Sequence, residues 1–155
     1  MSKFQIIIRK FWIKVEKPIW SFIINLCFWL IHLNKISYVR ALKDELKERP
    51  LDNAMKWFEW TADNFKDWTQ WPSTLIYNDF KGDCDDAARL GYWWFKQNGV
   101  EADILNLYKS KEGHTICVTK DRTKMVSNGN VVILNPATWE ADVMEYFGNE
   151  YEVII

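Results

Sequence analysis

Residues 81–88 read Lys-Gly-Asp-Cys-Asp-Asp-Ala-Ala, and they open the helix on which the predicted fold is built. Asp83 is a suitable N-cap, and Asp86 stands three residues later, at the capping-box position that Glu or Gln usually holds. Gly99 is a typical stop signal, so we expect the helix to end just before it. Cys84 falls at the start of this helix, where the partial positive charge of the N-terminus favours the thiolate.

Downstream of this helix, apolar and polar residues alternate with the period of a strand. The segments with this pattern are 102–108, 114–119, 124–127 and 131–134. Asn128-Gly129 joins the last two segments and is a strong signal for a two-residue hairpin. A helix followed by such strands predicts an α+β fold, in which the Cys84 helix packs on a small antiparallel sheet.

Upstream of this helix, the sequence predicts further helices. Residues 36–49 (ISYVRALKDELKER) form a charged amphipathic pattern that ends before Pro50. Between Leu51 and Trp71, aromatic and apolar residues recur at three- and four-residue spacing, which predicts a second helix with a core-facing stripe. Pro72 breaks this pattern, so we expect residues 74–81 to form a loop or a short irregular segment.

The N-terminal residues differ from the rest, because a basic stretch is followed by fifteen uncharged residues, 19–33 (IWSFIINLCFWLIHL). No small-residue cleavage site follows, which disfavours a signal peptide. A transmembrane helix needs about 20 apolar residues. A short membrane span, an interfacial amphipathic helix and a helix buried against the domain all stay open. We expect an N-terminal segment, 1–34, that is a membrane anchor or a packed helix, and a catalytic domain at 35–155. Localisation stays open between a membrane and the cytoplasm.

Composition limits the classes of function. A chain of 155 residues, 48% of them hydrophobic, has room for one domain with a real core. Three cysteines without a CxxC pair argue against a disulfide framework and a zinc ribbon, and no Gly-rich phosphate loop is present. We therefore expect no metal and no cofactor. Residues 1–50 carry ten Lys/Arg against four Asp/Glu, whereas residues 51–155 carry ten against seventeen, and this acidic part disfavours nucleic acid as a partner.

One histidine lies outside the apolar N-terminal segment, namely His114, at the beginning of a predicted strand. Asn135 ends the last predicted strand, before Pro136. A cysteine nucleophile needs a base, and the base needs a third group that orients its ring. Because a helix N-terminus and two strand ends can converge at one edge of a sheet, we predict Cys84, His114 and Asn135 as catalytic residues. A zinc site that adds Cys117 is disfavoured, since residues three apart on a strand point to opposite faces.

The motif at 82–88 (GDCDDAA), with a His that starts one strand and an Asn that ends a later one, resembles the bacterial transglutaminase-like cysteine peptidases. The similarity covers residues 70–139 and includes a Trp-Pro lead-in at 71–72. It implies a papain/transglutaminase-like core and a thiolate–imidazolium pair that forms an acyl-thioester with a peptide or protein substrate. The Cys84 backbone N–H would contribute to the oxyanion hole. Two positions depart from the pattern, because Asn135 stands where Asp is more usual and no aromatic residue follows His114 at the family's usual position.

The same residues leave other functions open. Water as the acceptor gives a peptidase or amidase, whereas an amine gives a transglutaminase. The alternative from another class is a non-catalytic interaction module of the same fold, which binds a partner or a membrane through its tryptophan-rich surface. A cell-wall amidase of the CHAP type also uses Cys and His, but usually with a longer spacing than the thirty residues from Cys84 to His114. The sequence does not fix an oligomeric state.

Overall fold

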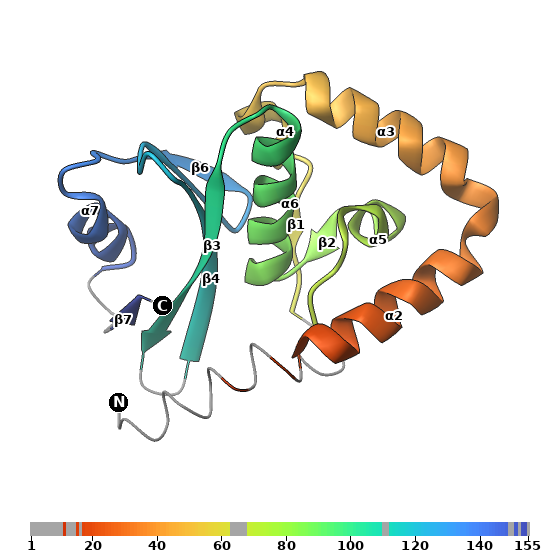
Figure 1. Cartoon of the computed structure of the whole chain (residues 1–155), viewed down its shortest axis with the longest axis horizontal. Coiled ribbons are helices and arrows are strands. Elements are labelled where there is room, and N and C mark those ends of the chain that lie inside the picture. Colours follow the sequence, from red (N-terminus) through yellow and green to blue (C-terminus); the bar gives the residue numbers. More distant parts are fainter. Residues whose placement is uncertain are drawn as a thin grey trace.

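A computed structural model of the chain describes residues 11, 15, 17–62, 68–109, 112–148, 151 and 153–154. Helices and strands combine in an α+β arrangement, which confirms the predicted class. A five-stranded sheet carries a helix on each of its two faces, and further helices lie beyond one of these (Figure 1).

The larger sheet is antiparallel throughout. Its strands are β3 (Ala102–Lys109), β4 (Glu112–Thr119), β5 (Lys124–Ser127), β6 (Asn130–Ile133) and β7 (Val153–Ile154), in the order β6-β5-β4-β3-β7. The four predicted strands are confirmed, and β7 is an addition that the sequence did not reveal. Asn128 and Gly129 have φ values of 47° and 79°, the left-handed values that a tight two-residue hairpin requires.

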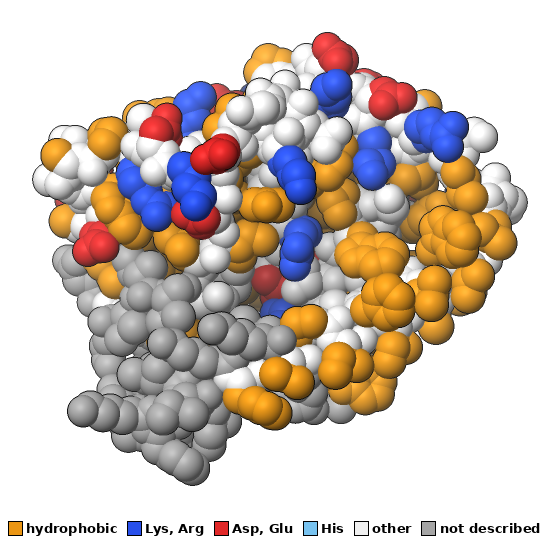
Figure 2. Space-filling model, in the orientation of Figure 1, with side chains coloured by type: hydrophobic (Ala, Val, Ile, Leu, Met, Phe, Trp, Pro, Cys, Tyr) orange, Lys and Arg blue, Asp and Glu red, His pale blue; other side chains and the backbone are white. Residues whose placement is uncertain are grey.

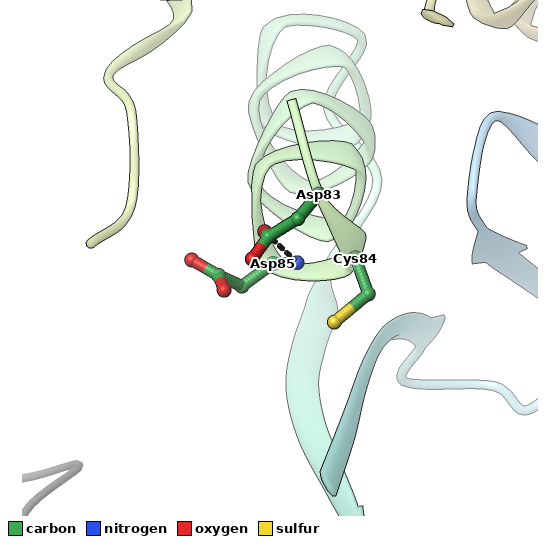
Figure 3. A group of neighbouring side chains, drawn as sticks. All are labelled: Asp83, Cys84 and Asp85. Carbon is green, nitrogen blue, oxygen red and sulfur yellow. Dashed lines mark hydrogen bonds between the residues drawn. The ribbon is translucent and has the colours of Figure 1, made fainter. Parts of the chain in front are cut away.

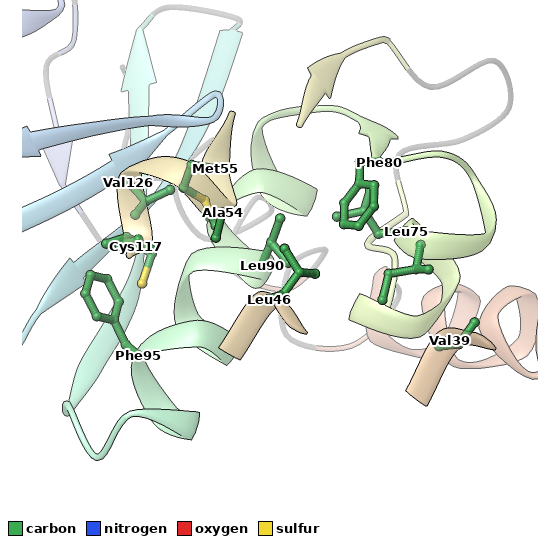
Figure 4. Close-up of a cluster of buried hydrophobic side chains, with 13 residues drawn as sticks. Val39, Leu46, Ala54, Met55, Leu75, Phe80, Leu90, Phe95, Cys117 and Val126 are labelled. Carbon is green, nitrogen blue, oxygen red and sulfur yellow. The ribbon is translucent and has the colours of Figure 1, made fainter. Parts of the chain in front are cut away.

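The two helices on this sheet are α6 (Cys84–Gln97) and α7 (Trp139–Tyr146). Alternate strand residues serve the two faces. Cys117 and Val126 join a buried cluster with Phe95 of α6 (Figure 4), whereas Ile116 joins a second cluster with Val143 of α7. The predicted Cys84 helix is therefore confirmed on one face, and α7, which the sequence did not predict, covers the other.

The elements before α6 are α2 (Lys17–Ile31), the short 3-10 turn η2 (Leu33–Lys35), α3 (Ile36–Glu48), α4 (Leu51–Met55) and α5 (Pro72–Tyr77). The predicted charged helix is confirmed as α3. Its Leu46 is buried together with Met55 of α4, Leu75 of α5 and Leu90 of α6 (Figure 4). Helices α3 to α5 thus enclose the side of α6 that the sheet leaves open.

The helix predicted from Leu51 to Trp71 is wrong beyond α4, which ends at Met55. The chain continues as β1 (Glu59–Trp60), which runs parallel to β2 (Lys81–Gly82); residues 63–67 lie outside the described part. The helix stops because a tertiary hydrogen bond replaces a helical one. Glu59 N donates to the carbonyl of Phe80 at 3.0 Å instead of to a carbonyl one turn earlier in the chain. The aromatic spacing that resembled a helix therefore belongs to a chain that pairs with a distant strand.

The loop expected after the Pro72 break is also wrong in part, because residues 72–77 form α5. Pro72 is the first residue of this helix, a position where the missing N–H would have no helical partner in any case. Leu75 and Ile76 are buried, so packing against the core stabilises a helix that is too short to form by itself.

Helix α2 buries its polar side and exposes its apolar side, the reverse of an ordinary surface helix. Its buried residues are polar, Ser21 and Asn25, whereas apolar Ile23 is 43% exposed. Asn25 Nδ2 donates to Thr69 O at 2.8 Å, and Asn25 Oδ1 accepts from Trp71 N at 2.6 Å. Ser21 Oγ accepts from Thr69 N at 2.8 Å. The polar face therefore holds α2 on the domain, and a wide apolar patch faces outward over this helix (Figure 2).

The predicted N-terminal segment, 1–34, is described continuously only from Lys17 onward. Within the described residues, no single helix has the length and apolar character needed to cross a membrane. Helix α2 and the stretch Leu33–Glu48 meet that criterion only as a pair, with a bend of 74° between them.

Gly91 provides a test of the packing of α6 on the sheet. A Cβ at this position would lie 2.9 Å from Val126 Cβ, and a β-branched side chain cannot easily turn away. We expect Gly91→Ala to lower the free energy of unfolding, because an overpacking cost of about 1–3 kcal/mol exceeds a helix-propensity gain of at most about 1 kcal/mol. Urea unfolding measures the difference. Gly113→Ala is the control, since its Cβ would meet Tyr108 at 3.4 Å, an ordinary contact. An equal loss in both variants would contradict this explanation.

Candidate active site

Cys84 is the first residue of α6, and the predicted capping box holds this end of the helix. Asp83 Oδ1 accepts from Asp85 N at 3.0 Å, and Asp86 Oδ2 accepts from Asp83 N at 3.2 Å. A Cβ on Gly82 would collide with the Asp86 carboxylate, which explains the glycine. The geometry of the helix start thus explains why positions 82, 83 and 86 hold Gly, Asp and Asp. It does not explain the residue types at Cys84 and Asp85.

The Cys84 thiol is partly buried where α6 meets β4. Burial raises its pKa to about 12, and the carboxylates of Asp83 and Asp85 contribute to the rise. The Thr115 backbone N–H, which donates a hydrogen bond to the sulfur, and the Lys17 ammonium lower the pKa but are outweighed. The thiolate expected at a helix N-terminus is therefore not the stable form at neutral pH in this arrangement.

His114 is buried on the face of β4 that α7 covers. Its Nε2 lies 2.9 Å from Ser127 Oγ, and its ring packs edge-on against Phe147 with 4.9 Å between centroids. Tyr151 lies further out, at 6.2 Å between centroids. Burial lowers the pKa of His114 to about 4, so the ring is neutral at pH 7. In this conformation His114 is a packed, hydrogen-bonded ring.

The structure does not bring the His114 ring to the Cys84 sulfur. Strand residues alternate between faces, so Thr115 lines a pocket with residues of α6 while His114 points to the α7 side. Among the described contacts of these two residues, none joins their side chains. The sulfur does reach the strand itself, through the N–H of the peptide that follows His114. The two predicted residues are thus neighbours through the backbone but not through their side chains.

Asn135 has a turn-forming role in place of the predicted orienting one. Its side chain is exposed, and Oδ1 accepts from Ala137 N at 3.0 Å. Its own N–H donates to Asp142 Oδ2 at 2.7 Å, in α7. An Asn that bonds the backbone two residues on forms an Asx turn, a common use of this residue before proline. These contacts form the turn that precedes α7. The hydrogen-bond partner of the His114 ring is Ser127 and not Asn135.

A pocket of about 330 Å³ opens beside the start of α6. Its wall includes Asp85, the next residue after Cys84, and Thr115, whose N–H bonds the sulfur. Helix α2 contributes Lys17, and Lys17 Nζ forms an ion pair with Asp85 Oδ1 at 2.7 Å. Arg89, one turn further along α6, adds a second positive charge to the wall. Cys84 is not a lining residue itself, but its neighbours Asp85 and Thr115 belong to a cavity with both charged and apolar walls.

Sequence reasoning missed Lys17 and Thr69, the two partners of Asp85. They lie 68 and 16 residues upstream of it, so no local pattern connects them. One signal was available, because the capping box uses the carboxylates of Asp83 and Asp86 and leaves that of Asp85 without a local role. A buried carboxylate without a local role predicts a distant basic or hydroxyl partner.

Asp83, Cys84 and Asp85 hold potential metal-ligand atoms within 4.8 Å of one another (Figure 3). Both carboxylates are already engaged, that of Asp83 by the N–H of Asp85 and that of Asp85 by Lys17. A cation at this place would have to displace the Lys17 ammonium. The arrangement is therefore that of a helix cap with an ion pair.

Asp86 gives the site a measurable pH dependence. Its carboxyl is fully buried, and burial, with repulsion from Asp85, raises its pKa to about 7 despite the opposing hydrogen bonds from Gln70 and Asp83. The unfolded chain releases this proton near pH 4. The folded protein keeps it up to about pH 7, so the stability that it contributes is full below pH 4 and is lost as the pH rises to 7.

We expect the free energy of unfolding of the wild type, relative to Asp86→Asn, to fall between pH 4 and 7 by up to about 1.4 kcal/mol per pH unit. Urea unfolding of both proteins across this range measures the difference. Asp79→Asn, at an exposed carboxyl, is the matched control. A flat difference for Asp86→Asn, or an equal slope for Asp79→Asn, would show that Asp86 does not retain its proton.

The α+β arrangement, with the Cys84 helix on an antiparallel sheet, is the part of the predicted architecture that the structure shows. The resemblance to transglutaminase-like cysteine peptidases rests on the sequence around Cys84 and on the order of Cys84, His114 and Asn135. Comparison of the chain with protein-family models, with curated proteins and with solved structures gave no match.

Proposed function

We propose that this chain is a transglutaminase-like cysteine hydrolase, which acts on a peptide or amide bond through an acyl-thioester on Cys84. The observation that carries the proposal is the position of the sulfur. Cys84 begins a helix that packs on an antiparallel sheet, and its sulfur meets the His114–Thr115 peptide beside a pocket. A Cys84–His114 pair would follow from movement of the His114 ring, whereas Asn135, which is held in its turn, takes no part in this pair.

The pairing of β4 with β5 bears on this movement. Strand β5 pairs with β4 at Cys117 and Val118 and ends at Ser127, so its register leaves His114 and Thr115 without a β5 partner. The sulfur lies near this stretch, since the Thr115 backbone N–H is one of the groups that lower the pKa of Cys84. Rotation of the His114 side chain away from Ser127 and around the strand edge would carry a ring nitrogen toward the sulfur.

With the ring at the sulfur, His114 takes the thiol proton while Cys84 attacks the carbonyl carbon and the C–S bond forms. The C–N bond then breaks, and His114 gives the proton to the leaving amine. Water attacks the thioester with His114 as its base, the carboxylic acid leaves, and the proton returns to the sulfur. An amine in place of water gives transamidation. The Cys84 N–H, which belongs to the helix turn without carbonyl partners, is one donor for the oxyanion.

A non-catalytic interaction module of the same fold is the second candidate. The observation that favours it is the present setting of His114, which already has a hydrogen-bond partner in Ser127 and an aromatic neighbour in Phe147. The raised pKa of Cys84 points the same way, because a protonated thiol is a poor nucleophile. The two candidates differ in whether the state of Cys84 depends on His114.

Alkylation with iodoacetamide measures this dependence. In the wild type we expect Cys84 to react more slowly than Cys27, which is exposed. Ser127→Ala removes the partner that holds the ring, so His114 becomes free to pair with the sulfur, and we expect Cys84 to react about tenfold faster for each unit by which its pKa falls. Mass spectrometry of the labelled peptides gives both rates. The double variant Ser127→Ala/His114→Gln is the control, and it should react as the wild type does.

Acyl transfer is tested with p-nitrophenyl acetate, whose ester transfers an acetyl group to a reactive thiol. Because exposed Cys27 would react with the ester as well, it is replaced by Ser in both proteins. We expect nitrophenolate release and an acetylated Cys84 in Ser127→Ala/Cys27→Ser, and slower release in Ser127→Ala/Cys27→Ser/Cys84→Ala. If Cys84 stays unmodified, and its alkylation rate is the same with and without His114, the hydrolase proposal fails and the interaction module remains.

A further inference from the structure

The outer face of α2 is an apolar surface that the fold leaves uncovered within the described residues. Its exposed side chains, between 37% and 72% accessible, are Ile19, Phe22, Ile23, Leu26, Trp29, Leu30 and Ile31. They form the wide apolar patch over α2 in Figure 2. Large contiguous apolar patches are rare on the surfaces of monomeric soluble proteins, and where they occur they mark interaction sites.

The orientation of α2 is fixed by hydrogen bonds on its other side. Asn25 is fully buried and bonds the backbone of Thr69 and Trp71, so α2 cannot turn its apolar side inward without breaking these bonds. The same bonds tie α2 to the non-helical segment 69–71. If α2 crossed a bilayer in this arrangement, that irregular backbone would enter the hydrocarbon as well, which is unfavourable. The helix is therefore suited to lie along a surface.

A basic groove adjoins this apolar face and runs along α3, with residues of α5 and α6 in its wall. Arg40, Lys43 and Lys47 of α3 line it, together with Trp29 of α2, and its volume is about 360 Å³. Asp44 is the one acidic residue among the described lining residues. Figure 2 shows Lys and Arg side chains over α3 on the same side of the molecule as the apolar patch.

The basic side chains of the groove favour an anion. Lys43 Nζ lies 5.4 Å from the centroid of the Trp93 ring, half-buried in the groove. Burial lowers the pKa of this ammonium, and Asp44 offsets that effect only in part. A negatively charged group placed between Arg40, Lys43 and Lys47 would compensate for the lost hydration. Phosphate, which carries several acceptor oxygens, has the chemistry to do so.

We propose that α2 and α3 dock this protein on an anionic membrane surface, with the outer face of α2 among the acyl chains and the basic groove on lipid phosphates. The juxtaposition fits a lipid surface because Trp29 stands between the apolar face and the groove, the level at which tryptophan lies in membranes. The inference does not depend on the chemistry at Cys84.

Flotation of the full chain with vesicles tests the proposal. We expect the protein to float with phosphatidylcholine vesicles that contain phosphatidylglycerol, and to float less with phosphatidylcholine alone. High salt should weaken the binding, because it screens the attraction to the headgroups. Absence of binding to the anionic vesicles, or equal binding to both kinds, would overturn the proposal.

Matched variants separate the two parts of the surface. Leu30→Glu should reduce partition into anionic vesicles at least tenfold, because a charge would have to enter the acyl region. Ile133→Glu, at a 72% exposed position on β6, is its control and should bind as the wild type does. Arg40→Gln with Lys47→Gln should reduce partition about fivefold for each charge removed, whereas Lys56→Gln with Lys124→Gln, outside the groove, should not. Equal loss in test and control variants would overturn the assignment of the surface.

Cys27 gives a readout in the unmodified protein. It is exposed on α2 and shares a helix face with Ile23, four residues before it, and Leu30, three residues after it. We expect a charged maleimide to label Cys27 in solution and to be blocked by anionic vesicles. Labelling that vesicles leave unchanged would overturn the proposal. So would size-exclusion chromatography that finds a dimer which Leu30→Glu converts to a monomer, because a second copy would then cover this face.

Discussion

The two helices that flank the candidate pocket, α2 and α6, both depend on the segment 69–71, which their side chains bind. Asp86 of α6 accepts from Gln70 N at 2.6 Å and from Gln70 Nε2 at 2.7 Å. Asn25 of α2 bonds Thr69 and Trp71 on either side of that residue. A buried backbone group that loses its partner costs about 1–3 kcal/mol. The cap of α6 and the seat of α2 are therefore coupled, because one short stretch of backbone satisfies both.

Local signals predicted the parts of the fold that local interactions hold. The capping box at Asp83, the turn at Asn128-Gly129 and the alternation of 102–108 each need only neighbouring residues, and each is found in the structure. The predictions that were wrong concern segments whose conformation depends on residues distant in the sequence. The stretch after Met55 pairs with β2, and α5 is helical because the core covers it. Helix α2 is a special case, since the sequence shows Ser21 and Asn25 only as interruptions in an apolar run, whereas in the structure they are its contact face.

Of the candidate site, the sequence predicted where Cys84 lies but not where the side chains of His114 and Asn135 lie. Cys84 stands where its helix begins, and that follows from the motif alone. The face on which His114 lies does not, because a shift of one residue in the pairing of β4 with β3 would turn the ring to the other side of the sheet. The β4 register opposes His114 to Leu107 and sends its ring to Ser127. Asn135 illustrates a different limit, since an Asn before proline serves a turn as readily as it serves a triad.

The order of the chain gives the contact between α2 and segment 69–71 a consequence for biosynthesis. Asn25 is separated from Thr69 by 44 positions, so α2 emerges from the ribosome well before the backbone that binds it. During this interval the amide of Asn25 lacks its partners in segment 69–71, while all the apolar residues of the outer face have been synthesised. Domains fold after enough of the chain has been synthesised. The nascent helix is thus available to a lipid surface or to a chaperone before the domain on which it finally rests exists.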